Sequence, residues 1–501
     1  MMLPKFRVLF FAGLAGKIAY ALSSLVVLPA LTSLLGQESI GLLGFFTSLL
    51  MVFMALDGGV TSAVTRKLAA AGTLRVRSPR RYRLYVFSVT NTFFLLFLAL
   101  GVLTSGILVL GSGMLSGKWL NVEQLESSQV QGAIFWMGVF IGLNFPIMLL
   151  QAAFHGREMH VRLNFLYVPY AFARTLGVLA VLMLFEAWAT IDFYFFLQAL
   201  LQFCYLVLLV FFYFYGDGLS GLWVRPSVRF IRQALSFGSG VLMISLTSVA
   251  VVQIDKVYLS GQLSLSDYAV YTLAGTFASI PYILSSALYA ALFPRFSTYY
   301  ACRDIFHMGR MFGVVFLFFG SVLLVACVLI WFFSGDLLRL IFDDGLAVAV
   351  QGLLPILFIG TALQALLIVP YSLQLAVGWT SLALRINLLA LPLILISLPV
   401  AVDGFGMLGA AWVWLSYNVL AFAITLYLMK RRFAFLRVVF LRSIKFFPCM
   451  FFLFAPICYA FELWVMPGLS KGMVFLVVMF LGAGSVALTT WWFRRDLIAV
   501  V

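Results

Sequence analysis

The stretch GLLGFFTSLLMVFMALDGGVTSAVTRK, residues 41–67, decides the fold class. Residues 41–56 carry no charge, an acid follows at Asp57, and the basic pair Arg66–Lys67 closes the stretch. Apolar runs of about 20 residues are typical of membrane-spanning helices. Similar runs recur along all 501 residues, so the stretch is one span among many.

The composition agrees with a membrane protein. Hydrophobic residues make up 64% of the chain and charged residues 10%, whereas soluble domains carry about 25% charged residues. The weak alternating pattern of an outer-membrane barrel is absent. Because the backbone must satisfy its own hydrogen bonds in lipid, we expect an all-α polytopic bundle.

About fourteen spans can be placed, which puts both termini on the same side of the membrane. Their approximate bounds are 9–35, 40–65, 84–110, 132–154, 163–185, 192–215, 237–260, 268–292, 311–333, 350–374, 384–401, 408–429, 446–465 and 472–493.

The loop charges orient these spans. Basic residues gather in the loops that follow even-numbered spans, as in residues 66–83 and 430–445, while the opposite loops hold only Lys118, Arg339 and Lys471. Since cytoplasmic loops are rich in Lys and Arg, both termini are predicted to be cytoplasmic. The net charge of +15 therefore reflects topology, and no nucleic-acid partner is expected.

The chain also contains an internal repeat. LTSLLGQESIGLLGFF, residues 31–46, and VYLSGQLSLSDYAVY, residues 257–271, share a Gly-Gln turn at an offset of about 225–229 residues. Six spans per repeat give two parallel six-helix lobes, which is transporter architecture. The predicted divisions are an N-lobe (1–215), an interfacial linker (216–236), a C-lobe (237–430) and two additional spans (431–501).

Three segments carry a resemblance to a known family. They are LPALTSLLG with the opening stretch, QIDKVYLSGQLSLSDYAVYTLAGTFASIPYILSSALYAALFPRFS (253–297), and the region from YSLQLAVGW through GFGMLGAAWVW to LYLMKRR (371–432). In order and spacing they resemble polysaccharide flippases of the Wzx type, in the multidrug/oligosaccharidyl-lipid/polysaccharide exporter superfamily.

The resemblance implies a protein of the bacterial inner membrane that works within membrane lipid. It implies transfer of an undecaprenyl-pyrophosphate-linked oligosaccharide to the periplasmic leaflet, for O-antigen, capsule or exopolysaccharide synthesis with a polymerase and a chain-length regulator. An ion gradient, H⁺ or Na⁺, is the implied energy source. No other cofactor is expected, and the sequence has no G-x-x-x-x-G-K-[ST] phosphate loop.

Three charged residues are predicted near the membrane midplane: Lys17, Asp57 and Arg174. At 1.5 Å per residue from the nearest basic loop residue, they lie about 15, 13–14 and 18 Å deep respectively. Lys17 and Arg174 are predicted to line a cavity and to bind the pyrophosphate, because intramembrane cations are costly and mark functional sites. The alternative is that Lys17 simply pairs with Asp57.

Asp57 has three open interpretations. Asp-Gly-Gly interrupts a helix, so Asp57 can cap the helix that follows. It can also pair with Lys17, or titrate as the site that couples transport to an ion.

For the other polar residues within the spans, the sequence does not predict which ones face a cavity. Gln253, Asp255 and Lys256 form an external gate or an interfacial pair. Eight amides at membrane depth either join helices or bind sugar hydroxyls: Asn144, Gln151, Gln198, Gln202, Gln364, Gln374, Asn387 and Asn418.

Competing functions remain open. A multidrug or organic-cation antiporter of the same superfamily would favour deep acids, whereas here cations predominate. A lipid II flippase would share the fold and differ in the sugar. The sequence shows no nucleophile–base constellation and no metal-ligand spacing, so neither an enzyme nor a metal site is expected.

Overall fold

The computed structural model describes residues 27–72, 78–215, 226–379, 381–464, 473, 476–485 and 487. These residues are mainly helical and contain no β-strand, and an isolated bridge joins Asn121 to Ser264. The predicted all-α fold is confirmed.

The described residues up to Ala269 form one compact unit, and those from Val270 form a second. The first unit contains α2 (Gln37–Met54), η1 (Ala55–Asp57), α3 (Val60–Ala70), α5 (Pro79–Met114), η2 (Leu115–Trp119), α6 (Ser127–Gly156), α7 (His160–Phe172), η3 (Ala173–Gly177), α8 (Val178–Leu184), η4 (Glu186–Trp188), α9 (Ile191–Val210), η5 (Phe211–Tyr215), α10 (Val228–Gln262) and the start of α11 (Leu265–Ala278). The second contains the rest of α11, α12 (Ile280–Ala301), α13 (Ile305–Leu338), α14 (Asp344–Leu366), α15 (Ile368–Ala376), α16 (Ser381–Arg432) and α17 (Leu436–Trp464).

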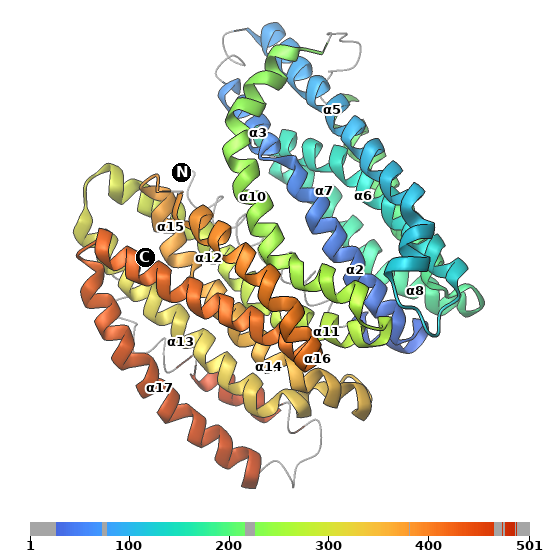
Figure 1. Ribbon diagram of the computed structural model, residues 1–501. Helices are drawn as coiled ribbons and strands as arrows, with labels where there is room; N and C mark the ends of the chain where they lie inside the picture. The colour runs from blue at the N-terminus through green and yellow to red at the C-terminus, as the bar shows by residue number, and fades with distance from the viewer. Residues whose placement is uncertain are drawn as a thin grey trace. The chain divides into compact units, whose positions relative to one another are not determined.

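Helix α6 is the centre of the first unit. It packs against α3, α5 and α9, and α10 packs against α2 (Figure 1). At the crossing of α5 with α6, a Cβ on Gly101 would lie 2.3 Å from the carbonyl oxygen of Gly142. Small residues of this kind let membrane helices approach closely.

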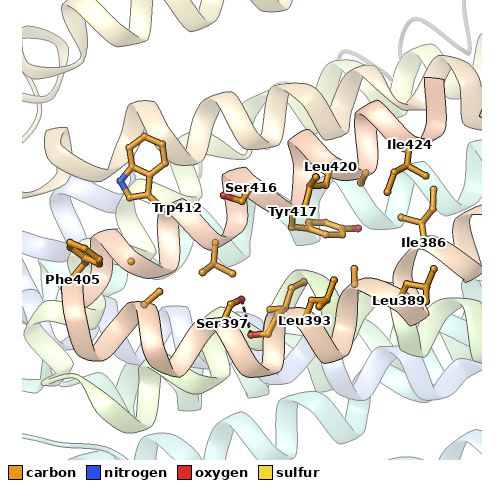
Figure 2. Close-up of a pocket in the computed structure, with 16 residues that line it drawn as sticks. Ile386, Leu389, Leu393, Ser397, Phe405, Trp412, Ser416, Tyr417, Leu420 and Ile424 are labelled. Atoms are coloured by element: carbon orange, nitrogen blue, oxygen red, sulfur yellow. Dashed lines mark hydrogen bonds between the residues drawn. The ribbon is translucent and has the colours of Figure 1, made fainter. Parts of the chain in front are cut away.

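In the second unit, α14 packs against both α13 and α16, while α12 packs on α15 and α17 packs on α13. Helix α16 is a hairpin of two limbs, because the backbone breaks at Gly406, where φ is 58°. Figure 2 shows the limbs running side by side, with Phe405 near their junction. A Cβ on Gly409 would lie 2.0 Å from the carbonyl oxygen of Ala401, so only glycine fits this crossing.

The helices agree with the predicted spans. Eleven helices in the described ranges are long and apolar enough to cross a membrane. Because α16 contains two predicted spans, 384–401 and 408–429, the eleven helices account for twelve of the fourteen. The first predicted span, 9–35, lies largely outside the described residues, whereas the last, 472–493, includes the short apolar helix Leu476–Ser485.

The lobe boundaries remain a prediction. Helix α10 begins at Val228, inside the predicted linker 216–236, and runs without a break into the predicted seventh span. Although that span was assigned to the C-lobe, α10 packs against α2 and α3 in the first unit.

Candidate functional site

Asp57 lies where the second predicted span breaks. Gly58 and Gly59 follow it with φ of 56° and 74°, in the left-handed region that favours glycine. The Asp57 carboxylate accepts hydrogen bonds from the backbone N–H of Thr61 at 3.0 Å and from its hydroxyl at 2.7 Å. Thr61 lies in the first turn of α3, where N–H groups lack helical partners, so the carboxylate caps α3.

The other two interpretations of Asp57 stay predictions. Lys17, its proposed partner and the first of the two predicted pyrophosphate ligands, lies outside the described residues.

Arg174 lies in the π-helical turn η3, half-buried among α6, α7 and α9. Its Nε donates to Oε1 of Gln198 at 2.6 Å, and Nε2 of Gln198 donates back to the carbonyl oxygen of Arg174 at 3.0 Å. The guanidinium carbon lies 4.5 Å from the centroid of the Phe140 ring. These contacts fix the orientation of the cation, and π-helical turns are frequent at functional sites.

Neutral polar side chains continue from Arg174 through the interior of the first unit. Tyr170 donates to Oε1 of Gln202, whose Nε2 donates to Oδ1 of Asn144 at 2.9 Å. Nδ2 of Asn144 in turn lies 2.8 Å from Sδ of Met54, three residues before Asp57. These contacts connect Tyr170, one helical turn before Arg174, through Gln202 and Asn144 to the end of α2.

The three residues of the predicted external gate lie on α10. Nζ of Lys256 donates to Oδ1 of Asp255 at 3.1 Å and to the carbonyl oxygen of Val252 at 3.0 Å. Gln253 is 3% exposed, and its Nε2 lies 2.7 Å from Sδ of Met51 on α2. The acid and the base thus form a local pair, and the gate itself remains a prediction.

A more extensive polar cluster, absent from the sequence-based site, lies where α2 begins. Glu38 is 1% exposed, and its carboxylate accepts hydrogen bonds from three consecutive backbone N–H groups: Glu123 at 2.8 Å, Gln124 at 3.0 Å and Leu125 at 2.8 Å. Such charge-assisted bonds are strong, so Glu38 fixes the loop between α5 and α6 to the start of α2.

The same end of the first unit also contacts the turn after α10. Nε1 of Trp119 donates to Oγ of Ser260 at 3.0 Å, and Nε2 of Gln37 donates to the carbonyl oxygen of Ser266 at 2.9 Å. The backbone N–H of Leu265 donates to the carbonyl oxygen of Asn121 at 2.9 Å. We call the side chains of Gln37, Glu38, Trp119 and Asn121, with their partners, the end cluster. The Gly-Gln turn repeated in both halves, which the sequence analysis used only to identify the repeat, could have drawn attention to this region.

Lys67 marks the opposite, basic end of the first unit. Its Nζ donates to Oε1 of Gln233 at 2.8 Å and lies 5.3 Å from the centroid of the Phe230 ring. Burial, together with the neighbouring charge of Arg66, lowers the pKa of the Lys67 ammonium. These contacts join the end of α3 to the start of α10.

The eight amides predicted at membrane depth lie in both units, four in each. Asn144, Gln151, Gln198 and Gln202 lie in the first unit on α6 and α9. The other four line a pocket of about 270 Å³ in the second unit, formed by α12, α14, α15 and α16. Its polar lining residues are Tyr282, Ser285, Gln364, Tyr371, Gln374, Asn387, Tyr417, Asn418 and Thr425.

Comparison with known proteins fits this architecture. Residues 242–400 match the MatE protein family. A relative described as "Putative O-antigen transporter", from Shigella flexneri, is 23% identical over 398 residues, which cover 79% of this chain and 91% of the relative.

Two solved structures share the fold of this chain. A multidrug resistance MATE family transporter of the MOP superfamily, in an inward-facing conformation, gives a TM-score of 0.67 at 13% identity, covering 83% of this chain and 95% of that chain. The lipid II flippase MurJ, in an inward closed conformation, gives 0.67 at 13% identity, covering 98% and 100% respectively. The resemblance to this superfamily is confirmed, and the chain shares the fold of these two transporters.

Proposed function

We propose that this protein moves an undecaprenyl-pyrophosphate-linked oligosaccharide from the cytoplasmic to the periplasmic leaflet of a bacterial inner membrane. It does so by alternating access, with both termini in the cytoplasm and an H⁺ or Na⁺ gradient as the energy source. The glycan then passes to a polymerase and a chain-length regulator, for O-antigen or a related polysaccharide. The similarity to a putative O-antigen transporter over 398 residues supports this class of cargo.

The geometry of Arg174 is the observation that carries the proposal. A cation within a membrane span is energetically costly, so its presence indicates a functional site. Here the guanidinium lies in a π-helical turn and is oriented by Gln198 and Phe140. Guanidinium groups recognise phosphate oxygens through paired hydrogen bonds. A pyrophosphate is therefore a suitable ligand for Arg174, with Lys17 as the proposed second cation.

An organic-cation antiporter is less well supported by the same residues. Such a substrate would call for a deep carboxylate facing it. Asp57 is the acid that the sequence places at this depth, and its carboxylate already accepts two hydrogen bonds from Thr61. Asp57 is still the proposed candidate for ion coupling, because a capping carboxylate can also take up a proton.

Export assays in cells test the cationic site. We expect Arg174→Ala to reduce surface glycan more than tenfold at equal expression, and Lys17→Ala to do likewise. Arg162→Ala is the matched control, because Arg162 lies on the preceding helix α7 and is exposed. Full export by both the Lys17 and the Arg174 variants would contradict the proposal.

A further inference from the structure

Three helix ends meet at the basic end of the first unit. Helix α3 ends there, and helices α5 and α10 begin there (Figure 1). Tyr85 of α5 packs edge-on against Phe230 of α10, with ring centroids 5.8 Å apart, and Nζ of Lys67 at the end of α3 lies 5.3 Å from the centroid of the same Phe230 ring. Segments far apart in the sequence therefore converge around Phe230.

Hydrogen bonds hold the same three ends together. Nζ of Lys67 donates to Oε1 of Gln233 on α10 at 2.8 Å. The backbone N–H of Ser227, the residue before α10, donates to Oγ1 of Thr92 on α5 at 3.0 Å. The start of α10 is thus fixed to both α3 and α5, so the three helix ends form one surface.

This surface is strongly cationic. Besides Lys67, it carries six exposed arginines: Arg66, Arg80, Arg81, Arg83, Arg229 and Arg232. Residues 58–122 and 218–254, which contain all three helix ends, include no Asp or Glu. The turn after α6, which packs against the end of α3, adds the acid Glu158. We call these seven cations the basic surface, and their charge favours an anionic partner.

Helical spacing places several of these cations close to the three-way contact. Arg81 lies one turn before Tyr85 on α5, and Arg229 lies one turn before Gln233 on α10, so each shares a face with a residue of that contact. Arg232 lies three residues after Arg229 and shares its face in turn. The cations of α5 and α10 therefore flank the same contact.

Exposed apolar side chains accompany these cations. Val228 is 77% exposed and lies one turn before Arg232, while Leu84 is 36% exposed and lies three residues after Arg81. Cations beside exposed aliphatic side chains, at the start of a predicted span, fit a lipid at the membrane boundary. The cations contact its headgroup and the aliphatic groups contact its chains, whereas a free phosphate ion would use the cations alone.

We propose that the basic surface binds an anionic phospholipid in the leaflet that it faces. Arg81, Arg229 and Arg232 contact the phosphate of the headgroup, and Leu84 and Val228 contact the CH₂ groups nearest to it. The bound lipid bridges α5 and α10 and stabilises their contact. This inference is independent of the cargo assigned to Arg174, which lies in η3.

Lipid binding to the purified full-length protein tests the site by native mass spectrometry. The probes are phosphatidylglycerol and, as the zwitterionic comparison, phosphatidylcholine with the same acyl chains. We expect wild-type protein to bind phosphatidylglycerol about tenfold more tightly than phosphatidylcholine, because each cation near the headgroups attracts anionic lipid. The triple variant Arg81→Gln, Arg229→Gln, Arg232→Gln should lose this preference.

A matched control separates the site from the general positive charge of the protein. The triple variant Arg437→Gln, Arg442→Gln, Lys445→Gln removes the same charge from exposed positions along the single helix α17, and it should keep the preference. An equal loss in the two triple variants would overturn the site. Equal binding of the two lipids by wild-type protein would overturn it as well.

Thermal unfolding confirms that each variant folds and gives a second measurement. Phosphatidylglycerol should raise the unfolding midpoint of the wild-type and control proteins and leave that of the Arg81, Arg229 and Arg232 triple variant unchanged. If this triple variant does not fold, Arg81→Gln alone takes its place and should weaken the preference. Excess inorganic phosphate should give no comparable rise, and a rise as large as that with the lipid would overturn the assignment to a phospholipid.

Discussion

At the scale of single residues, burial distinguishes acids that look alike in the sequence. Glu38 lies in the first turn of α2 and Glu123 in the loop before α6, yet Glu38 is 1% exposed and accepts three backbone hydrogen bonds, while the Glu123 side chain is exposed. The role of Glu38 is therefore structural, and it depends on the loop that folds over it.

Replacing Glu38 by Gln should destabilise the protein markedly. The amide can accept from fewer of the three N–H groups and turns its own donors toward them. Hydrogen bonds to charged groups contribute about 1.5–3 kcal/mol each, so we expect a loss of at least about 2 kcal/mol. Thermal unfolding in detergent measures this loss. Glu123→Gln, in the loop that Glu38 binds, should leave the midpoint unchanged, and an equal effect of the two substitutions would contradict the structural role of Glu38.

Asp57 gives a second prediction at this scale. Asp57→Ala removes the cap of α3 and should cost about 1 kcal/mol of stability, whereas Asp57→Asn keeps an acceptor for the N–H of Thr61. If Asp57 also titrates during transport, Asp57→Asn will be stable but will lose the pH dependence of transport. A stable Asp57→Asn variant with unaltered pH dependence would exclude Asp57 as the coupling site and leave capping and the pairing with Lys17.

The sequence predicted part of the site at this scale. Arg174 and Asp57 stood out because charge at membrane depth is rare. Glu38 did not, because an acid beside a turn is ordinary unless the fold covers it. The four amides of the second-unit pocket were candidates, but their convergence depends on how α12, α14, α15 and α16 pack, and a one-dimensional pattern does not contain that packing.

At the scale of helices, close crossings depend on single glycines. Gly101 and Gly142 face one another where α5 crosses α6, each with its carbonyl within 2.6 Å of where the other's Cβ would lie. Gly106 lies on the same helix with nothing within 4 Å of its Cβ position.

We therefore expect Gly101→Ala to separate α5 from α6 and to destabilise the protein by about 1–3 kcal/mol. Gly106→Ala should be neutral or slightly stabilising, because alanine favours the helical state over glycine. The difference between the two unfolding midpoints is the measurement. Equal midpoints would mean that α5 and α6 do not cross in contact at Gly101.

At this scale the positions of the membrane spans could be predicted from the sequence, whereas irregular turns within the helices could not. The apolar run predicted a span at 40–65, and Asp-Gly-Gly indicated the break between α2 and α3 that one interpretation of Asp57 requires. The turn at Gly406 separates two predicted spans within α16. The π-helical turn at Ala173–Gly177 left no comparable signal, because its residues read as an ordinary apolar helix around Arg174.

At the scale of the whole molecule, topology follows from loop charge. The prediction places the loop of Glu123 in the periplasm and the loop of Arg303 in the cytoplasm. In a background without native cysteines, Glu123→Cys should react with a membrane-impermeant maleimide in intact cells, and Arg303→Cys should react only after permeabilisation. The reverse pattern would contradict the predicted orientation of both loops.

The central claim is that this protein carries a lipid-linked glycan across the bilayer, and reconstitution into proteoliposomes tests it most directly. The measurement is the transfer of a fluorescent undecaprenyl-pyrophosphate-linked oligosaccharide between leaflets, driven by an imposed H⁺ or Na⁺ gradient. We predict transfer well above that of protein-free vesicles, reduced more than tenfold in Arg174→Ala. Transfer no faster than in protein-free vesicles under either gradient, with gradient-driven movement of an organic cation in the same vesicles, would contradict the claim.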